Sequence, residues 1–443
     1  MFVGLFATGG LVLAGCRGIQ TPDEKQARQD FGAVADQYRP ASRPAPPELT
    51  PDSNLSNYLA FALLNSPTVE AAFYGWSASV ENITVTRSLP DPQLTLQAYI
   101  TDTLTSLMPG LFQSIPGPGK LKARAGVAAA DSQGKYSAFE SAVLQAAFNL
   151  KRAYYKLGLL DEQLRIEREA LALLDNQERA VRAQNATGTA KLADALRVQS
   201  ERDRVITDLA NLEDSRRSLM ENFKAALGLT SQQSDPPVPA HFETSSENPD
   251  ADALLRTAFE RNPQLKAMAA DVRAAEAGIA VAYKERVPDF SAGLSADVYA
   301  PPFYWPQAGM TLPIWRDKLA AEAAQAKATE MAAKSKLKAG QIELAVNFAG
   351  KSFTYRETSR NCALIENELL PKARQSVEIV RAGYRTGTME FSAMTGTERM
   401  LLDLQLEAAQ ARTDREIALA ELSLMIAGVP PAHAPLLSNT PQP

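Results

Sequence analysis

The stretch LPDPQLTLQAYITDTLTSLMPGLFQSIPGPGK, Leu89–Lys120, decides the fold of this 443-residue chain. From Gln93 onward polar and apolar side chains alternate with a period of two, which is typical of a β-strand with one apolar face. The same alternation occurs at Phe290–Val298. A turn and a short extended run follow each strand, at Gly110–Ile115 and at Ala308–Pro313. The sequence therefore predicts two hairpins.

Two environments fit these hairpins. One is an outer-membrane barrel, where Leu94, Leu96, Leu294 and Ala296 would face lipid while polar positions such as Gln97 and Ser295 would face a wet lumen. The other is an ordinary hairpin packed on helices, which has the same periodicity. If the strands span a membrane, the chain must oligomerise, because four strands cannot close a barrel and open edges are not tolerated in lipid.

Very long helices are predicted on both sides of the hairpins. No proline occurs between Gly119 and Asp235, and Pro371 is the single proline between Ile314 and Val429, in a chain with 28 prolines. Apolar side chains recur every seventh residue in this region, as in a coiled coil; they are Leu159, Ile166, Leu173 and Ala180. We expect Pro371 to kink its helix rather than end it.

Short motifs recur in the same order about 200 residues apart. The pairs are Asn65-Ser66-Pro67 with Arg261-Asn262-Pro263, Leu89-Pro90-Asp91 with Val287-Pro288-Asp289, Ile115-Pro116 and Lys120-Leu121 with Leu312-Pro313 and Lys318-Leu319, Thr187-Gly188-Thr189 with Thr386-Gly387-Thr388, and Leu227-Gly228 with Ala427-Gly428. This period is too long for a solenoid. It predicts an internal duplication of one unit made of helix, hairpin, long helix, turn and helix.

The repeat and two Pro-rich stretches divide the chain. The predicted segments are a signal peptide at 1–15, a lipidated N-terminal arm at 16–51, a first repeat at 52–230, a linker at 231–250, a second repeat at 251–429 and a C-terminal tail at 430–443. Prolines cluster in the arm and in the linker, which is typical of connecting segments.

The two cysteines are predicted to have different roles. LAGC, Leu13–Cys16, follows an apolar run and resembles the lipobox of bacterial lipoprotein precursors. Cleavage before Cys16 would leave a thiol that carries diacylglycerol and palmitate and anchors the chain in a membrane. Arg17 is not the Asp of an inner-membrane retention signal, so the outer membrane is expected. The alternative is a chance cysteine, since no Lys or Arg precedes Cys16; Cys362 reads as a buried small side chain.

Several classes of function are disfavoured by composition and motifs. The net charge is -5 and the basic residues are scattered, so no basic stripe predicts nucleic-acid binding. The sequence contains no Ser/His/Asp or Cys/His constellation, no phosphate-binding glycine loop and no metal-ligand cluster, which argues against an enzyme and predicts no cofactor beyond the lipid on Cys16. No apolar run after residue 16 is long enough for a transmembrane helix.

Together these features resemble the TolC-like outer-membrane efflux proteins, the exit ducts of tripartite pumps. The resemblance covers about Leu55–Gly428 and is carried by the duplication, by LPDPQLTL and IPGPGKL, and by the paired tips ATGTAKLADAL and AGYRTGTMEFSAM. It implies a mainly α fold with a membrane β-barrel: three chains of four strands form one twelve-stranded barrel, and the long coiled-coil helices form a periplasmic tube.

The resemblance also implies a function and partners. The expected function is passive export of small molecules or metal cations through the outer membrane, with a periplasmic adaptor and an inner-membrane pump as partners. IPGPGKL is similar to the return found in branches associated with heavy-metal and cation efflux. The alternative is a periplasmic coiled-coil adaptor or scaffold lipoprotein, with helical hairpins but no barrel.

A gate is implied where the tips of the two repeats meet. In the resembling family a Tyr, an Arg and a first-repeat Asp hold neighbouring helices closed. Tyr384 and Asp194 match two of these residues, but Met389 stands where the Arg would be. Any latch here is therefore expected to be weaker or differently made.

The inward acidic pair of the family is replaced by Ala393 and Gly396. Glu390 is the nearest carboxylate, and threefold symmetry would turn it into a ring of three carboxylates that attracts cations. The alternative is that Glu390 begins its helix, where a carboxylate complements the helix dipole.

Overall fold

The computed structural model describes residues 20–38, 46–100, 104–186, 191–244, 251–298 and 303–426. Within these ranges the elements, in chain order, are α2 (Pro22–Tyr38), α3 (Leu55–Asn65), α4 (Pro67–Arg87), β1 (Gln93–Ile100), β2 (Leu104–Ile115), α5 (Lys120–Ala186), α6 (Leu192–Ala226), α7 (Ala251–Arg261), α8 (Pro263–Lys284), β3 (Phe290–Asp297), β4 (Phe303–Met310), α9 (Arg316–Leu364), the π-helical turn η2 (Ile365–Leu369), α10 (Leu370–Arg385) and α11 (Phe391–Met425). The chain is mainly helical with one small sheet, as predicted. Cys16 and the tail at 430–443 lie outside the described residues.

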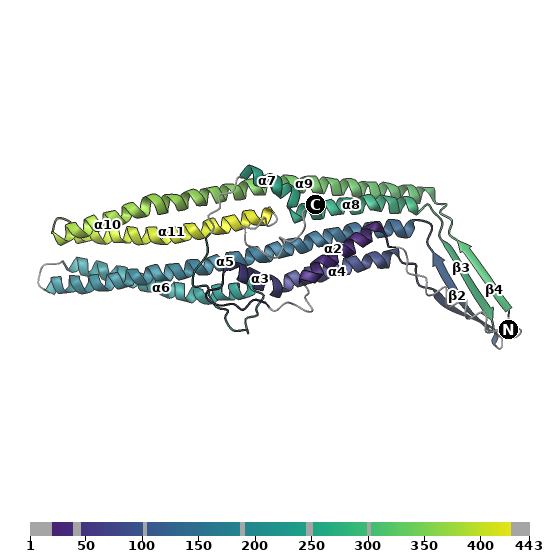
Figure 1. The fold of residues 1–443 in the computed structure, drawn as a ribbon, viewed down its shortest axis with the longest axis horizontal. Helices are drawn as coiled ribbons and strands as arrows, with labels where there is room; N and C mark the ends of the chain where they lie inside the picture. The colour runs from purple at the N-terminus through teal and green to yellow at the C-terminus, as the bar shows by residue number, and fades with distance from the viewer. Residues whose placement is uncertain are drawn as a thin grey trace. The chain divides into compact units, whose positions relative to one another are not determined.

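Residue contacts divide the chain into two compact units. The first unit includes 71–140 and 263–342 and contains the whole sheet, whereas the second includes 141–262 and most of α9 to α11. Figure 1 shows the strands of the first unit side by side, and the hairpins α5/α6 and α10/α11 of the second. The helices α5 and α9 contribute residues to both units.

The sheet is antiparallel throughout, with strand order β1-β2-β3-β4. The predicted first strands are confirmed at Gln93 and Phe290. The second strands begin earlier than predicted, at Leu104 instead of Gly110 and at Phe303 instead of Ala308. Backbone pairing across each hairpin extends these strands into residues whose side chains do not alternate, so periodicity alone could not find their starts.

The long helices are confirmed. Helix α5 runs for 67 residues without interruption. Helix α9 continues through η2 into α10, so Pro371 does not end the helical path. The π turn ends two residues before Pro371 and contains Asn367, the residue whose carbonyl the proline ring would meet in a regular helix.

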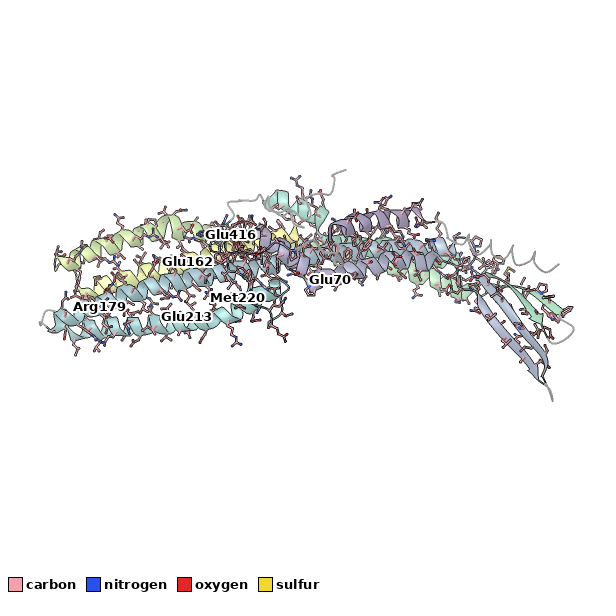
Figure 2. All side chains as sticks on the ribbon, turned by 60° about the horizontal axis from the view of Figure 1, so that its bottom comes forward. Glu70, Glu162, Arg179, Glu213, Met220 and Glu416 are labelled. Atoms are coloured by element: carbon pink, nitrogen blue, oxygen red, sulfur yellow. The ribbon has the colours of Figure 1, made fainter. Side chains whose placement is uncertain are left out.

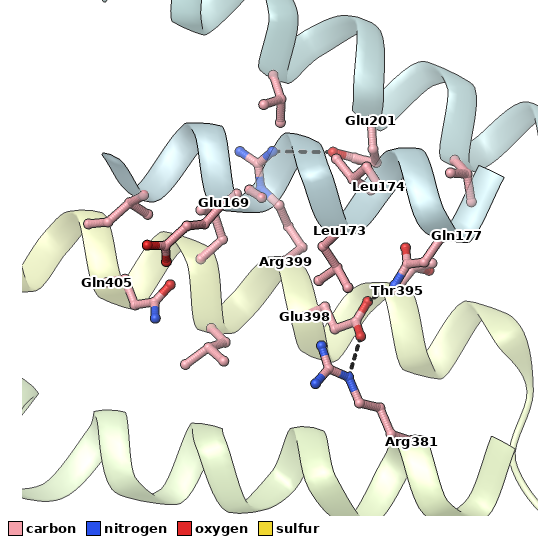
Figure 3. Close-up of a pocket in the computed structure, with 16 residues that line it drawn as sticks. Glu169, Leu173, Leu174, Gln177, Glu201, Arg381, Thr395, Glu398, Arg399 and Gln405 are labelled. Atoms are coloured by element: carbon pink, nitrogen blue, oxygen red, sulfur yellow. Dashed lines mark hydrogen bonds and ion pairs between the residues drawn. The ribbon is translucent and has the colours of Figure 1, made fainter. Parts of the chain in front are cut away.

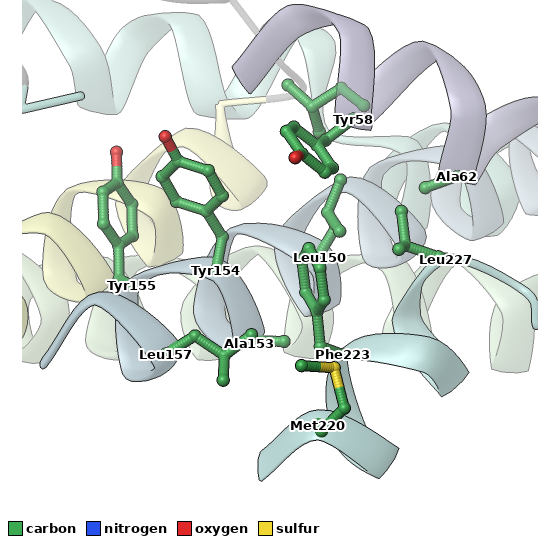
Figure 4. Close-up of a cluster of buried hydrophobic side chains, with 11 residues drawn as sticks. Tyr58, Ala62, Leu150, Ala153, Tyr154, Tyr155, Leu157, Met220, Phe223 and Leu227 are labelled. Carbon is green, nitrogen blue, oxygen red and sulfur yellow. The ribbon is translucent and has the colours of Figure 1, made fainter. Parts of the chain in front are cut away.

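A hydrophobic core in the second unit joins α3, α5 and the end of α6 (Figure 4). Tyr58 of α3 is fully buried and its ring lies 5.7 Å from that of Phe223. The Tyr58 hydroxyl donates to the carbonyls of Pro237 and Thr50, at 3.0 and 3.2 Å. Burial of this phenol is therefore compensated by hydrogen bonds, as buried tyrosines require.

Gly228 ends α6 at a position that only glycine tolerates. Its φ is +76°, and an added Cβ would lie 2.4 Å from the carbonyl oxygen of Asn65. The backbone N–H of Leu229 donates to Lys224 and that of Gly228 to Ala225, which is a Schellman motif. The recurring Leu227-Gly228 motif therefore ends a helix; its counterpart at 427–428 lies outside the described residues.

Helix α2 was not predicted within the N-terminal arm. It packs on α4: the ring of Phe31 lies 5.3 Å from Phe73 and 5.1 Å from Trp76. Glu24 is fully buried, and its N–H donates to the hydroxyl of Thr21 at 3.2 Å. Thr21 and Glu24 have the spacing of a capping box, which is the sequence signal that could have predicted this helix start.

Figure 2 labels charged side chains of α5 and α6, namely Glu162 and Arg179 of α5 and Glu213 of α6. Glu213 of α6 binds Arg168 of α5 at 3.0 Å, and both are more than half exposed. Exposed pairs of this kind add little stability. Cys362 is buried, as predicted, and burial raises its thiol pKa. No described helix is both long enough and apolar enough to cross a membrane.

Candidate functional site: the strand sheet and the helix tip

One face of the sheet is apolar across all of its strands. Leu94, Leu111, Leu294 and Pro306 stand directly opposite one another in consecutive strands. Leu94 is 80% exposed and Leu294 52% exposed, although both are large apolar side chains. Ala296 lies on the same face, two residues along β3. The chain therefore presents a continuous apolar surface that it does not bury itself.

The opposite face is mixed: it carries the polar and small residues of β1 to β3 together with Phe112 of β2 and Trp305 of β4. Thr95, Gly110 and Ser295 form one row across β1, β2 and β3. An added Cβ on Gly110 would lie 2.6 Å from Ser295 Oγ and 2.8 Å from Thr95 Oγ1, so a larger residue there would force these side chains to move. The hydroxyl of Ser106 donates to Asp297 at 2.7 Å. The predicted alternation therefore places Gln97 and Ser295 on the face opposite Leu94 and Leu294, but that face also carries apolar side chains such as Phe112 and Trp305.

An ionic clasp closes the junction between β2, β3 and α5. Asp289, immediately before β3, accepts from Lys120 Nζ at 2.9 Å and from the Gly117 backbone N–H at 2.7 Å. Lys120 Nζ also donates to Glu285 at 3.1 Å, and Arg124 binds the same carboxylate at 3.1 Å. Lys120 is 3% exposed.

The pKa values of the clasp follow from these contacts. Burial by itself lowers the pKa of Lys120, but the hydrogen bonds to Asp289 and Glu285 outweigh it and raise that pKa. Burial opposes ionisation of Asp289 as well, but bonds from Gly117 and Lys120 lower its pKa. Both groups therefore remain charged at neutral pH, which is what a buried pair needs to be stable.

The second-repeat tip is a tight turn between α10 and α11. Gly387 has a φ of +74°, in the left-handed region that favours glycine. The backbone N–H of Thr388 donates to the Gly383 carbonyl at 2.9 Å, and the Thr386 hydroxyl donates to the same carbonyl at 3.0 Å. The motif Thr-Gly-Thr therefore builds this turn. Its first-repeat counterpart at 187–189 lies outside the described residues.

Tyr384 contacts the first repeat, but through a residue that the sequence did not predict. Its hydroxyl donates to Gln184 Oε1 of α5 at 3.0 Å, and its ring lies 5.6 Å from Phe391. Asp194 lies in the first turn of α6, where its carboxylate complements the helix dipole. Among the described residues the partner of the Tyr384 hydroxyl is thus Gln184, not Asp194.

Met389 and Glu390 lie at the exposed start of α11. Met389 is 43% exposed, and its backbone N–H donates to the Gly383 carbonyl at 3.2 Å. Glu390 is the N-cap residue of α11, and its carboxylate accepts from the Ser392 hydroxyl at 3.2 Å. Glu390 therefore stands at the start of its helix, as the helix-dipole interpretation requires. It is also exposed, as a ring of carboxylates that attracts cations requires.

A charged seam joins α5 to α10 and α11 behind the tip (Figure 3). Glu398 of α11 accepts from Arg381 of α10 at 2.7 Å and from the side-chain amide of Gln177 of α5. The Glu398 side chain is 10% exposed. The three side chains border a cavity of about 210 Å³ that is otherwise lined mainly by apolar residues such as Leu173 and Leu402.

A second set of contacts in this seam involves Arg399. It binds Glu201 of α6 at 3.2 Å and Asp403 of its own helix at 2.9 Å. Glu167 of α5 lies nearby and is 5% exposed; burial and the charge of Asp208 raise its pKa. The seam therefore combines satisfied ion pairs with one costly buried carboxyl group.

Sequence reasoning missed the seam for a physical reason. Gln177 and Glu398 are 221 residues apart, and nothing in a helical repeat pattern matches distant charges with one another. Nowhere in the described ranges do three or more His, Cys, Asp or Glu side chains gather as metal ligands would. What the described residues offer is a sheet with two distinct faces, a tip and a seam between helices.

The sequence model of the outer membrane efflux protein family matches this chain twice, at residues 59–229 and 254–428. The chain therefore belongs to the outer membrane efflux protein family. Members of this family are efflux channels of tripartite pumps and not enzymes. No curated protein sequence matches the chain.

Solved structures of outer-membrane channels have the same fold. The open-state outer membrane channel MtrE of Neisseria gonorrhoeae aligns with a TM-score of 0.73 and 14% identity, over 88% of this chain and 94% of that one. The outer membrane protein VceC of Vibrio cholerae aligns with a TM-score of 0.68 and 15% identity, over 84% and 96%. The CmeC channel of Campylobacter jejuni gives 0.69 and 12%, over 88% and 90%.

Proposed function

We propose that this chain is the passive outer-membrane export duct of a tripartite efflux system and that it carries small molecules or metal cations from the periplasm and its pump to the exterior. The observation that carries the proposal is the sheet, which has two open edges, one face with a continuous row of apolar side chains, and an opposite face that carries its polar side chains. An apolar outside and a polar inside suit strands between lipid and a water-filled lumen.

Three copies close the assembly. Four strands are too few for a barrel, and lipid does not tolerate the open edges of β1 and β4, so the chain must oligomerise. The resemblance to TolC-like channels implies that three chains form one barrel of twelve strands. The helices form a periplasmic tube; at 1.5 Å per residue, α5 alone is about 100 Å long. The two family matches, each with helices flanking a hairpin, support the internal duplication.

Anchoring and partners complete the proposal. Cys16 carries a covalent lipid in the outer membrane, and Arg17 beside it is consistent with that location. The tube binds a periplasmic adaptor, which connects it to an inner-membrane pump. The pump selects the cargo, since a duct discriminates by width and charge alone.

The alternative is a periplasmic coiled-coil adaptor or scaffold lipoprotein without a barrel. It accounts for the long helices, but it gives no reason for a row of exposed leucines across the sheet. The sheet therefore favours the duct.

Imaging and conductance of the detergent-extracted protein test the proposal. A threefold tube that ends in a short barrel, and stepwise conductance in planar bilayers, are expected. A monomer or an open helical bundle without conductance would contradict the duct and favour the adaptor. Leu294→Arg, in which a charge enters the apolar face, is the matched negative control.

A further inference from the structure

The clasp at the base of the sheet joins two motifs that each occur twice in the chain. Lys120 follows β2 and Asp289 precedes β3, and the two side chains meet at 2.9 Å because β2 and β3 are neighbours. By the recurring motifs, Lys318-Leu319 corresponds to Lys120-Leu121, and Asp91 corresponds to Asp289. The chain therefore contains both halves of a second clasp.

The second clasp cannot form within one chain. Lys318 follows β4 and Asp91 precedes β1, and these are the outer strands of the sheet. Neighbouring strands lie about 4.8 Å apart, so roughly 14 Å separates the two edges. Lys318 and Asp91 therefore do not meet within one chain, although Lys318 lines a cavity that Glu285 and Asp289 also line.

The surroundings of Lys318 fit an incomplete site. Its side chain is 69% exposed, against 3% for Lys120, and its ion-pair contact is Glu322, 3.7 Å away on the same helix. Asp91 is exposed, and no ion pair joins it to another described residue. Beside Lys318, Trp315 is 72% exposed and Leu312 is 62% exposed, although both are large apolar side chains.

We propose that Lys318 of one copy binds Asp91 of the next copy, so that the edge of β4 pairs with the edge of β1 through the same clasp that joins β2 to β3. The proposal rests on the channel assembly proposed above and assigns its contact residues. Lys318 and Asp91 lie at opposite edges of the sheet, so the contact between copies is head to tail and can close a ring. Trp315 and Leu312 become covered in it.

The known register within the chain sets the expected register between chains. Gly110 of β2 lies opposite Ser295 of β3. Transferred through the motifs, this pairing places Gln307 of β4 opposite Gln97 of the next copy. Gln307 and Gln97 both lie on the polar face of the sheet, together with Thr95 and Ser295.

The charged residues beside Lys318 and Asp91 are also of opposite sign and would attract each other across the interface. In the first clasp Arg124 pairs with Glu285. By the repeat, Glu322 stands at the position of Arg124, and Arg87 stands at the position of Glu285. The second clasp would therefore bring together a carboxylate and a guanidinium group with their places exchanged. Arg87 is already bound by the buried Glu24 of α2, so its contribution across the interface is smaller. Lys318 and Asp91 therefore provide the sharper test.

Cross-linking between two distinguishable chains tests the contact directly. Asp91→Cys is placed in one full-length chain and Lys318→Cys in a second chain with a different tag, both also carrying Cys362→Ala, and the two are co-expressed in membranes. A short bismaleimide reagent is expected to join the two tags. Lys327→Cys in place of Lys318→Cys is the matched control, since Lys327 is exposed on the same helix but farther from the sheet.

Charge exchange tests the energetics of the same contact. Lys318→Asp alone or Asp91→Lys alone is expected to lower the temperature at which the detergent-resistant trimer dissociates. The double variant is expected to recover most of the loss, because it restores opposite charges across the interface. A purely structural effect on either junction would not be rescued by the second substitution.

Three results would overturn an assignment. Trimers without a cross-link above the Lys327 control, or a double variant no more stable than the single variants, would overturn the clasp. If these trimers conduct as the wild type does, the proposed function as a duct is retained although the clasp is refuted. Wild-type protein that forms no trimer would overturn the proposed channel and the clasp with it.

Discussion

At the scale of single residues, Glu167 is a buried carboxyl group whose charge costs stability. Burial, the most important cause, and repulsion from Asp208 and Asp403 raise its pKa, while Arg399 lowers it in part. A carboxyl group whose folded pKa is raised lowers the stability of the protein as the pH rises from its ordinary pKa of about 4.5 to its folded pKa, and the loss is complete above the folded pKa. Glu167 therefore destabilises the helical unit at neutral pH.

Replacement of Glu167 tests whether its ionised carboxylate destabilises the protein at neutral pH. Glu167→Gln is expected to raise the unfolding free energy at pH 7 by about 1 kcal/mol, because the buried charge is removed. The gain should shrink as the pH falls toward about 4.5, where the native Glu167 is itself protonated. Chemical denaturation at several pH values measures it, with the exposed Glu169→Gln as the control; a gain independent of pH would contradict the assignment.

Glu390 is the predicted source of cation selectivity at the tip. Glu390→Gln is expected to lower the cation-to-anion permeability ratio, because three carboxylates near the axis attract cations. Reversal potentials in planar bilayers under a salt gradient measure the ratio. Glu378→Gln, an exposed carboxylate of α10 away from the tip, is the control. An unchanged ratio would leave Glu390 with its N-cap role alone.

The tip contacts are predicted to hold the channel closed. Tyr384→Phe removes the hydroxyl that donates to Gln184 at 3.0 Å, and Asp194→Ala removes a carboxylate from the same region; each is expected to raise resting conductance. A neutral hydrogen bond contributes about 1 kcal/mol, so the single effects should be several-fold rather than complete. Tyr74→Phe, far along the chain from the tip, should have no effect. Closed-state conductance that matches wild type in both variants would remove these residues from the gate.

At the scale of elements, the sheet separates two kinds of side chain by strand alternation alone. Leu94 and Leu294 stand in one row across the strands, whereas Ser295 and Gln97 belong to the other face. The strands therefore present two chemically different surfaces of the same hairpin, and equal substitutions should have unequal effects on them.

Arginine substitutions distinguish the faces. Arg at Leu94, Leu96, Leu294 or Ala296 is expected to cost about 2 to 4 kcal/mol of insertion free energy near the membrane midplane. Arg at Gln97 or Ser295 is expected mainly to change conductance. Trimer yield in membranes reports the first effect and single-channel current the second. Equal yields for both sets would mean that the apolar face is not in lipid.

The helices show where local rules suffice. The exclusion of proline predicted α5 and the path through Pro371, because a missing N–H and a steric clash act on neighbouring residues of the same helix. Helix α2 escaped prediction, since its apolar contacts, such as Phe31 with Phe73, are made with another helix. Its capping box was the one local signal.

At the scale of the whole molecule, the lipid on Cys16 is the predicted second attachment to the membrane. Cys16→Ala is expected to abolish lipid labelling, while barrel insertion survives because the strands are an anchor of their own. Metabolic labelling and mass spectrometry of the mature N-terminus measure this, with Cys362→Ala as the control that keeps the label. An unmodified thiol at Cys16 in mature protein would refute the anchor.

The sequence by itself determined that the helices beside the hairpins are very long, that the first strand of each hairpin alternates, and which motifs occur twice. These features depend on contiguous residues, because periodicity and proline exclusion are local. The tertiary structure decided which distant groups meet: Lys120 with Asp289, Gln177 with Glu398, and Tyr384 with Gln184. A charged side chain on a helix surface has many partners of the right sign, and only the packing of helices and the order of strands brings one of them within hydrogen-bond distance.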